Sequence, residues 1–461
     1  MFLLRHRFPA DLLTPLAAYL ALRPAGAGLL LESADRGERV GRHSFVLLLG
    51  AEEARLEGRA TGWVASLRAL ALRQPGSEAI TGLPAGREAM PLGVGLAGYV
   101  GFEALAGLEP SLPLPAASLG LPTVWARTVR ESLVFDHLHQ VAELQVLGAD
   151  QPAAEARVGM LLGLLRTLSL ADEATPSRPV ARPLQDQATF EATVRRVKAY
   201  IHDGDVYQLV PSQRIEVLDP PPPLETYRRL RRLNPSPYAF LLEEADFALA
   251  GASPEMLVRV ADGEAETLPI AGTLPRGADE AEDRARFEAL KADPKERAEH
   301  QMLVDLARND LGRVAVPGGV RVEAPLALQR TSHVLHLTTT VKATLKPGLD
   351  ALDVLASVFP AGTVSGAPKL RAAQRIAELE GEARGPYGGA LIRLGVDGAL
   401  DSALILRTVT YAGDRAYLQA GAGIVKASDP TREYLETLHK MGAPAQALGV
   451  PLPTPDVVEA L

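Results

Sequence analysis

The sequence predicts an α+β fold, in which antiparallel β-sheets pack against helices, from two kinds of pattern that follow one another irregularly. Short apolar segments bounded by Gly and Pro, such as residues 44–50 and 93–102, are typical of strands joined by turns. Because helical patterns do not alternate regularly with such strands, a parallel βαβ sheet is not expected. The expected helices are 155–170, 189–203, 294–311, 367–380 and 431–441, and expected strands of the C-terminal part lie in 247–260, 403–413 and 415–425.

A Pro- and Ala-rich polar stretch divides the chain. With 461 residues and 47% hydrophobic content, the chain can bury a large core and forms two domains or one elaborate unit. Residues 171–188 have the composition of a linker. We therefore expect an N-terminal domain over 1–170 and a C-terminal domain over 189–450.

Composition excludes several classes of protein. The 48 basic and 56 acidic side chains give a net charge of −8, which offers no general attraction to nucleic acid or to an anionic membrane. The absence of cysteine excludes disulfides, thiolate metal sites and cysteine nucleophiles on this chain. Charged residues and Pro9 interrupt the N-terminal segment, and no apolar run reaches the roughly 18 residues of a membrane span. A cytoplasmic location is expected.

The segment "DPKERAEHQMLVDLARNDLGRV" (293–314) is predicted to be an amphipathic helix that carries acidic residues into its apolar face. Asp293 can cap it and Pro294 suits its first turn. The apolar stripe comprises Met302, Leu303, Leu306 and Ala307, and at about 100° per residue Glu299 falls in its middle, flanked by Glu296 and Asp310. An unpaired carboxylate in that position would be costly.

A second helix start, "SDPTREYLETLHK" (428–440), places Glu433, Glu436 and Lys440 on one face. Two Glu-x-x-Glu helices can direct four carboxylates at one volume, and such hard oxygen ligands suit Mg²⁺ rather than zinc. Two simpler explanations stay open: Glu296 can complete a capping box, and glutamate pairs are common on helix surfaces.

Three Gly-rich turns and one histidine are further candidates. Gly362, Thr363 and Ser365 precede a predicted helix, near Lys369, where backbone N–H groups favour an anion. Backbone can approach a ligand closely at Gly388, Gly421 and Gly423, although a plain turn or bulge explains each of them alone. His336, on a predicted strand, is a candidate acid or base, or a structural histidine.

Nine sequence blocks between residues 185 and 445 resemble, in order and spacing, those of the chorismate-utilising enzymes. They are "GDVYQLVPSQR", "NPSPY", "SPEMLVR", "PIAGTLPRG", "ERAEHQMLVDLARNDLGRV", "FPAGTVSGAPK", "RGPYGG", "AGAGIV" and "EYLETLHK". The N-terminal third also resembles the leading domain of that family, with "LLES" at 30–33 and "GYVGFE" at 98–103.

The resemblance implies the α+β fold and the anthranilate-forming activity of one branch of this family. Other members carry a lysine where this chain has Ala271, and a lysine there can activate water or attack the ring. Alanine does neither, which leaves ammonia as the nucleophile and anthranilate and pyruvate as products, the first step of tryptophan biosynthesis. The alternatives are formation of aminodeoxychorismate for folate synthesis, and a non-catalytic sensor of tryptophan or chorismate.

The same resemblance implies roles for individual residues. Mg²⁺ would be held by Glu299 and Glu436, with Glu296 and Glu433 close behind, and would bind the ring carboxylate of chorismate. Glu255 would protonate the departing C4 hydroxyl, and His336 would assist proton loss at C2. Thr363 belongs to the same catalytic group. The remaining substrate-binding positions are Gly272, Thr273, Tyr387, Arg407, Gly421, Ala422, Gly423 and Lys440.

Partners and regulation also follow from the resemblance. Glutaminases that feed this family use a cysteine nucleophile, so a chain without cysteine is expected to take ammonia from a separate glutamine amidotransferase subunit in a hetero-oligomer. Ser33, Pro237, Tyr238 and Ala239 match tryptophan-binding positions, so inhibition by L-tryptophan is expected. Leu274, where the family often has arginine, and Ala239, where a bulkier residue is common, depart from the family pattern.

Overall fold

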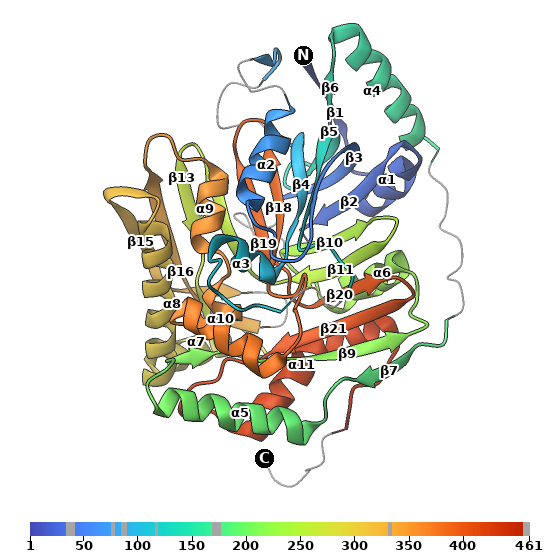
Figure 1. Cartoon of the computed structure of the whole chain (residues 1–461). Helices are drawn as coiled ribbons and strands as arrows, with labels where there is room; N and C mark the ends of the chain where they lie inside the picture. Colours follow the sequence, from blue (N-terminus) through green and yellow to red (C-terminus); the bar gives the residue numbers. More distant parts are fainter. Residues whose placement is uncertain are drawn as a thin grey trace.

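The computed structural model describes residues 1–33, 42–74, 79–83, 90–115, 119–167, 177–330 and 334–454, and Figure 1 shows helices surrounding a strongly bent sheet system. The helices are α1 (Pro15–Leu22), α2 (Trp63–Leu72), α3 (Leu105–Leu108), α4 (Gln151–Leu165), α5 (Gln187–His202), α6 (Pro223–Leu233), α7 (Glu280–Ala292), α8 (Pro294–Gly312), α9 (Ala351–Val358), α10 (Lys369–Glu380) and α11 (Pro430–Leu448), with 3₁₀ turns η1 (Arg23–Ala25), η3 (Phe102–Ala104) and η4 (Gly362–Val364).

The strands all pair antiparallel, which confirms the α+β prediction. They are β1 (Phe2–Pro9), β2 (Ala27–Glu32), β3 (His43–Leu56), β4 (Gly95–Val100), β5 (Val124–Asp136), β6 (Val141–Gly148), β7 (Val180–Pro183), β8 (Gln208–Leu209), β9 (Ser212–Leu218), β10 (Tyr238–Glu243), β11 (Phe247–Ser253), β12 (Met256–Ala261), β13 (Glu264–Thr267), β14 (Ile270–Pro275), β15 (Ala315–Arg330), β16 (Val334–Leu345), β17 (Gly366–Ala367), β18 (Ala390–Gly395), β19 (Leu400–Leu404), β20 (Thr408–Ala412) and β21 (Arg415–Gly421).

The long sheet branches at β5, and each branch ends at a different side of the candidate site. One branch runs through β3, β2, β10, β11, β20, β21 and β9. The other runs through β4, β18, β19, β12, β13 and β16, which also pairs with β14 and β15. Two inner faces can therefore be buried against each other, with alternating strand residues filling the space between them.

Aromatic side chains tie the two halves of the chain together. The ring centroid of Trp125 on β5 lies 5.5 Å from that of Phe247 on β11, and Tyr99 on β4 lies 5.7 Å from the same ring, both edge to face. Trp63 on α2 packs edge to face on Phe359 at 6.1 Å. These rings are buried, so the N-terminal and C-terminal segments share one core.

The expected domain boundary and linker fall on a part of the chain that is only partly described. Residues 171–176 lie outside the described residues, whereas 180–183 form β7, which pairs with β9, and α5 already starts at Gln187. Strands of the N-terminal segment pair with strands of the C-terminal segment, since β2 pairs with β10 and β4 with β18. The division into two domains stays a prediction.

The predicted starts of α8 and α11 agree with the structure, and an aspartate caps each of them, whereas the predicted start at 155 is wrong because Asp150 caps α4 and the helix begins at Gln151. Asp293 accepts a hydrogen bond from the backbone N–H of Glu296 at 3.0 Å, and Asp429 accepts one from that of Arg432 at 3.0 Å. The predicted end of the last helix at 441 is wrong, because α11 continues to Leu448 through Pro444. The buried apolar side chains of Met441 and Leu448 hold this extension against the core.

The buried stripe of α8 is shifted from the predicted one. Its buried residues are His300, Leu303, Val304, Ala307 and Leu311, whereas Glu299, Met302 and Leu306 are partly exposed. The reason is that α8 packs on β14, β15 and β16, so the face centred on Val304 and Ala307 meets the sheet. Glu299 therefore lies at the edge of the stripe. Among the described residues, no helix combines the length and apolarity needed to cross a membrane.

Candidate active site

Glu255 and Thr363 form the centre of the candidate site. Glu255 lies in the turn between β11 and β12, and the Oγ1 of Thr363 in η4 donates a 2.8 Å hydrogen bond to its Oε1. Burial raises the pKa of Glu255 to about 7, outweighing the opposing effects of this hydrogen bond and of the positive charge of Lys440. A carboxyl group that keeps its proton near neutral pH can act as a general acid.

A bulge in β14 lies opposite His336 on β16. The β14–β16 register shifts between Ala271 and Thr273, and Gly272 takes a positive φ of 61° that suits glycine. The carbonyl oxygen of Gly272 lies 3.1 Å from Nδ1 of His336, and because a carbonyl only accepts, Nδ1 carries the proton. Burial, and to a lesser degree the charge of Arg407, lower the pKa of His336. The ring is thus neutral near pH 7, with Nε2 as its basic nitrogen.

Close backbone approach at residues 421–423 makes another wall. Lys440 on α11 donates a 2.9 Å hydrogen bond to the carbonyl oxygen of Gly421, and a Cβ added to Gly421 would lie 3.1 Å from the hydroxyl oxygen of Tyr387. A Cβ on Gly423 would lie 2.9 Å from Nε2 of Gln208. Gly421 therefore needs glycine for steric reasons, because a Cβ there would also lie 2.6 Å from the carbonyl oxygen of Pro211.

Arg407 is a second cation at the site. Burial lowers the pKa of its guanidinium, and its Nη1 lies 3.4 Å from the side-chain oxygen of Asn234. Within the described parts of the chain, no carboxylate forms an ion pair with Arg407. A partly buried guanidinium with only a neutral partner is well suited to pair with the carboxylate of a ligand.

The four predicted metal ligands do not form a cage in this structure. Oε2 of Glu296 lies 3.1 Å from the position of a Cβ added to Gly272, and Glu436 forms a 2.7 Å ion pair with Lys440. Glu299 and Glu433 are half-buried. No group of three His, Cys, Asp or Glu side chains positioned for a metal occurs among the described residues. The donor set still fits Mg²⁺ chemically, because it consists of carboxylates on the two helices that flank the site.

The predicted anion site at the start of α10 has a different arrangement. Lys369 is engaged with the protein itself: its Nζ lies 2.8 Å from Oδ2 of Asp310 on α8 and 2.8 Å from the carbonyl oxygen of Val358. Asp310 is thus neutralised by Lys369 and does not join Glu299. Sequence reasoning missed this pair, since the two residues are 59 positions apart.

Gln208 is a site residue that the sequence did not single out. It is buried on β8, a strand of two residues, with its amide against Gly423. The only feature of the sequence that could have indicated Gln208 was its position within the block "GDVYQLVPSQR", because a strand of two residues has no periodicity to interpret. The backbones of Gly272 and Thr273 in β14 border the site. The side chain of Thr273 lies outside the described residues. Ala422 is buried, and its N–H donates a 3.2 Å hydrogen bond to the carbonyl oxygen of Pro211.

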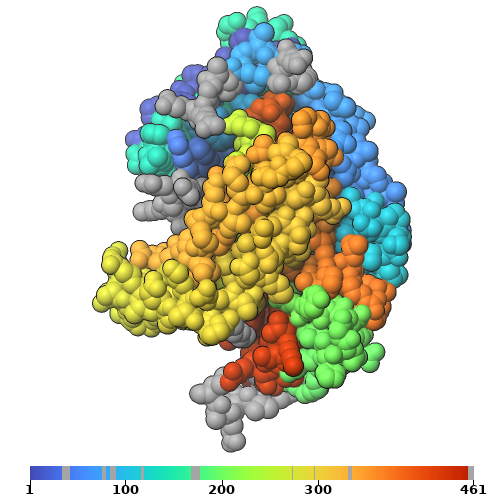
Figure 2. Space-filling model, turned by 90° about the vertical axis from the view of Figure 1, so that its left-hand side faces the viewer, coloured from blue at the N-terminus to red at the C-terminus, as the bar shows by residue number. Residues whose placement is uncertain are grey.

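The elements α8, β14 and β16 form one side of this region and α11 the other. Figure 2 shows residues of α7 to β16 (yellow to amber) as a projecting face above α5 (green) and α11 (red), with a hollow between them. A carboxyl group with a raised pKa, an imidazole with a lowered pKa and two cations lie on these elements and the turns beside them. Such a set can bind a small anion, protonate a leaving group and remove a proton.

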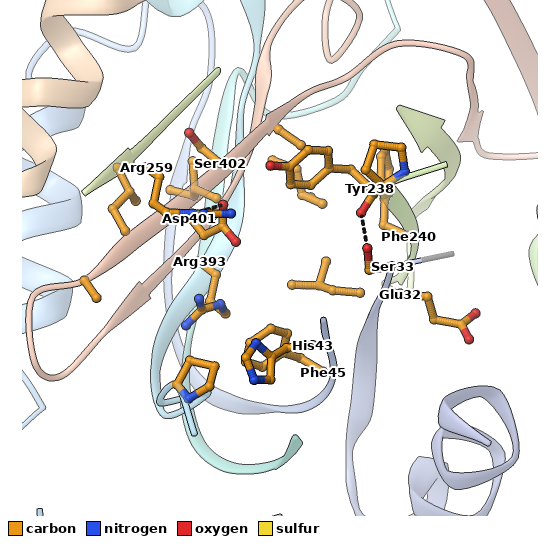
Figure 3. Close-up of a pocket in the computed structure, with 18 of the residues that line it drawn as sticks. Glu32, Ser33, His43, Phe45, Tyr238, Phe240, Arg259, Arg393, Asp401 and Ser402 are labelled. Carbon is orange, nitrogen blue, oxygen red and sulfur yellow. Dashed lines mark hydrogen bonds and ion pairs between the residues drawn. The ribbon is translucent and has the colours of Figure 1, made fainter. Parts of the chain in front are cut away.

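A second cavity, of about 330 Å³, brings together the four predicted tryptophan-binding residues. Ser33, Pro237, Tyr238 and Ala239 all line it, and the hydroxyl of Ser33 donates a 2.9 Å hydrogen bond to the carbonyl oxygen of Pro237 (Figure 3). The antiparallel pairing of β2 with β10, in which Glu32 faces Ala239, produces this convergence of residues about 200 positions apart. We name it the Ser33 cavity.

The opposite wall of the Ser33 cavity is charged. Arg393 and Asp401 lie there (Figure 3), and neither Nε of Arg393 nor Oδ1 of Asp401 has a hydrogen-bond partner within the described part of the chain. Burial lowers the pKa of His43, also on this wall, to about 4, so its ring is neutral. The cavity therefore offers an apolar volume with a buried donor on Arg393, a buried acceptor on Asp401 and the buried hydroxyl of Tyr238, which also lacks a hydrogen-bond partner among the described residues.

Fold and site define an enzyme that binds a small, multiply anionic acid. The family model described as chorismate binding enzyme matches residues 29–446, and the chain belongs to this family. It is 42% identical to anthranilate synthase component 1 of Streptomyces coelicolor over 95% of this chain and 87% of that protein, and 42% identical to that of Thermus thermophilus over 96% and 97%. A solved structure of anthranilate synthase component I from Streptococcus pneumoniae superposes with a TM-score of 0.78 at 32% identity, covering 95% of this chain and 99% of that one.

Proposed function

We propose that this chain converts chorismate and ammonia to anthranilate and pyruvate, as the first step of tryptophan biosynthesis. The observation that supports the proposal is Glu255, a carboxyl whose pKa burial raises to about 7 and which accepts a 2.8 Å hydrogen bond from Thr363; His336, with its lowered pKa, is proposed to act with it. The 42% identity to two proteins named anthranilate synthase component 1, over nearly the whole chain, supports this activity within the family.

Each of the site residues has a different proposed role in the reaction. Arg407 binds one carboxylate of the substrate, and Lys440 contributes a second positive charge near the Gly421 backbone. Ammonia attacks C2 of the ring while Glu255 gives its proton to the C4 hydroxyl, which leaves as water. The proton at C2 then passes to Nε2 of His336, the C3–O bond breaks with its electron pair on oxygen, and the ring becomes aromatic; the released enolpyruvate takes up a proton at its methylene carbon and becomes pyruvate.

We further propose that Glu299 and Glu436, with Glu296 and Glu433 behind them, hold Mg²⁺. When bound, the cation neutralises the ring carboxylate and withdraws electron density from the ring. The support is the donor chemistry, since carboxylates on α8 and α11 lie on either side of the site. In the present arrangement Lys440 neutralises Glu436, so metal binding requires that this ion pair be exchanged for the cation.

Ammonia is proposed to come from a partner glutamine amidotransferase subunit, and L-tryptophan to inhibit the enzyme from the Ser33 cavity. The chain has no cysteine in 461 residues, so it has no thiol with which to hydrolyse glutamine. The Ser33 cavity offers buried polar groups of both kinds to the carboxylate and amino group of an amino acid, next to apolar walls.

The experiment is product analysis with the purified chain, chorismate, MgCl₂ and an ammonium salt at pH 8. Formation of fluorescent anthranilate together with pyruvate supports the proposal. Formation of 4-amino-4-deoxychorismate would assign the chain to aminodeoxychorismate synthesis, and binding of chorismate without any turnover would indicate a sensor. A parallel reaction with EDTA tests the requirement for Mg²⁺.

A further inference from the structure

A small cavity lies directly behind the catalytic carboxyl group. Its volume is about 50 Å³, and Glu255 and Thr363 line it together with Leu306, Ala307 and Asp310. This volume holds a few water-sized molecules, since about 10–15 Å³ of such space accommodates one water. It is too small for a substituted cyclohexadiene ring. We name it the inner cavity.

A larger cavity of about 510 Å³ lies on the other side of the same wall. Asp310 lines both cavities, Val358 lines the inner one, and its neighbour Phe359 lines the larger one together with Lys369 and Leu370. The side chain of Leu370 is 42% exposed, so the larger cavity reaches the surface of the molecule. We name it the outer cavity.

A single ion pair closes the wall between the two cavities. The ammonium group of Lys369 donates to Oδ2 of Asp310 and to the carbonyl oxygen of Val358, both at 2.8 Å, and so links α8 to the end of α9. The side chains of Lys369 and Asp310 are only 12% and 14% exposed. An ammonium group has three N–H donors, and these two bonds use two of them. The third can serve a water molecule in either cavity.

We propose that Asp310 and Lys369 relay protons and water between Glu255 and the surface. This inference rests on the proposed function, in which Glu255 protonates the C4 hydroxyl. The C4–O bond breaks with its electron pair on oxygen, the Glu255 proton joins that oxygen, and water and a Glu255 carboxylate result. The water leaves through the inner cavity, and a solvent proton returns through the outer cavity, Lys369 and Asp310. Every turnover thus restores the acid without another reactant.

Glu255 is partly exposed in this structure, and the relay is needed when a bound substrate covers that exposed side. Its Oε1 accepts from Thr363, which lies on the same wall, and the substrate would cover its opposite side during turnover. A site closed to bulk water protects a reactive ring but also traps the released water. The relay allows the site to stay closed to bulk water during the reaction and still lets the released water leave.

The test is Lys369→Met, which keeps the bulk of the side chain and removes its protons. We expect kcat for anthranilate formation to fall about tenfold, because proton return and not the acid itself becomes limiting. The KM values for chorismate and ammonium should stay unchanged, the solvent deuterium isotope effect on kcat should rise, and imidazole buffer should restore part of the rate. Lys342→Met is the matched control, since Lys342 is held by ion pairs with Glu264 and Glu323 away from both cavities.

A second variant guards against misfolding of the first. Leu370→Trp fills the partly exposed outer cavity without removing the ion pair, and it should also lower kcat and raise the isotope effect. Native kcat and isotope effect in both variants would overturn the relay while leaving the proposed function intact. Absence of anthranilate from the native chain would instead overturn the proposed function, and the relay with it.

Discussion

Replacing Glu255 by Gln tests the site through two opposite effects. Gln has the same shape and can still accept the hydrogen bond from Thr363, but it has no proton to give. We expect kcat to fall by about 10²- to 10⁴-fold, the usual contribution of a general acid. In the native enzyme, kcat/KM should decline as pH rises through about 7, because the acid form of Glu255 is then lost.

The same substitution should stabilise the fold at high pH. Burial raises the pKa of Glu255 from 4.5 to about 7, so between these values the folded chain keeps a proton that the unfolded chain has lost. The free energy of unfolding therefore falls as pH rises through this window, by about 3 kcal/mol in total at 1.36 kcal/mol per pH unit. Gln does not ionise, so the variant avoids this loss.

Urea unfolding of both proteins at pH 5 and pH 8 measures the difference. The stability of Glu255→Gln relative to the native chain should increase by about 2 to 3 kcal/mol between the two pH values. Anthranilate fluorescence gives the activity of the same samples. An equal pH dependence of stability in the two proteins would show that Glu255 is not desolvated, and undiminished turnover by the variant would remove it from the role of acid.

Three further substitutions test other parts of the site. Glu436→Gln should abolish Mg²⁺-dependent turnover with an unchanged Tm, and full activity at saturating MgCl₂ would remove it from the metal ligands. Arg407→Gln should raise the KM for chorismate about 10- to 100-fold, as expected for a lost charged hydrogen bond, and an unchanged KM would show that Arg407 does not bind substrate. Ala239→Trp should fill the Ser33 cavity and eliminate tryptophan binding in calorimetry; retained binding would place the inhibitor elsewhere.

The features that could be predicted from the sequence are those that depend on residues close together in the chain. Asp293 and Asp429 cap their helices as predicted, because a cap involves only a few neighbouring residues. Glu255 and Thr363 were proposed as site residues because each lies in a block that resembles the family, and His336 because it lies on a predicted strand at a position similar to one of the family. The glycines at 421 and 423 have close protein neighbours, and their predicted closeness to a ligand stays a prediction.

The sequence could not reveal contacts between distant residues. The ion pair of Lys369 with Asp310 connects α10 to α8, and the pairing of Glu436 with Lys440 in place of a metal depends on what occupies the site. The helical-wheel prediction for α8 placed Glu299 in the middle of the buried stripe. This was wrong because residue spacing alone does not specify which face of a helix packs on a sheet. Packing on β14 and β16 moved the buried arc toward Val304.

The geometry of the strands also connects the Ser33 cavity to the acid. Tyr238, which lines the cavity, faces Ser253 across the β10–β11 pair, and Glu255 follows two residues after Ser253. On the other side, Ala403 lines the cavity, and the N–H of its neighbour Leu404 donates to the carbonyl oxygen of Glu255 at 3.0 Å. A ligand that separates these two strands must therefore move the backbone on which Glu255 sits. We propose that such a displacement would disturb the 2.8 Å contact of Glu255 with Thr363, so that the proposed inhibition by tryptophan would need no change in the overall fold.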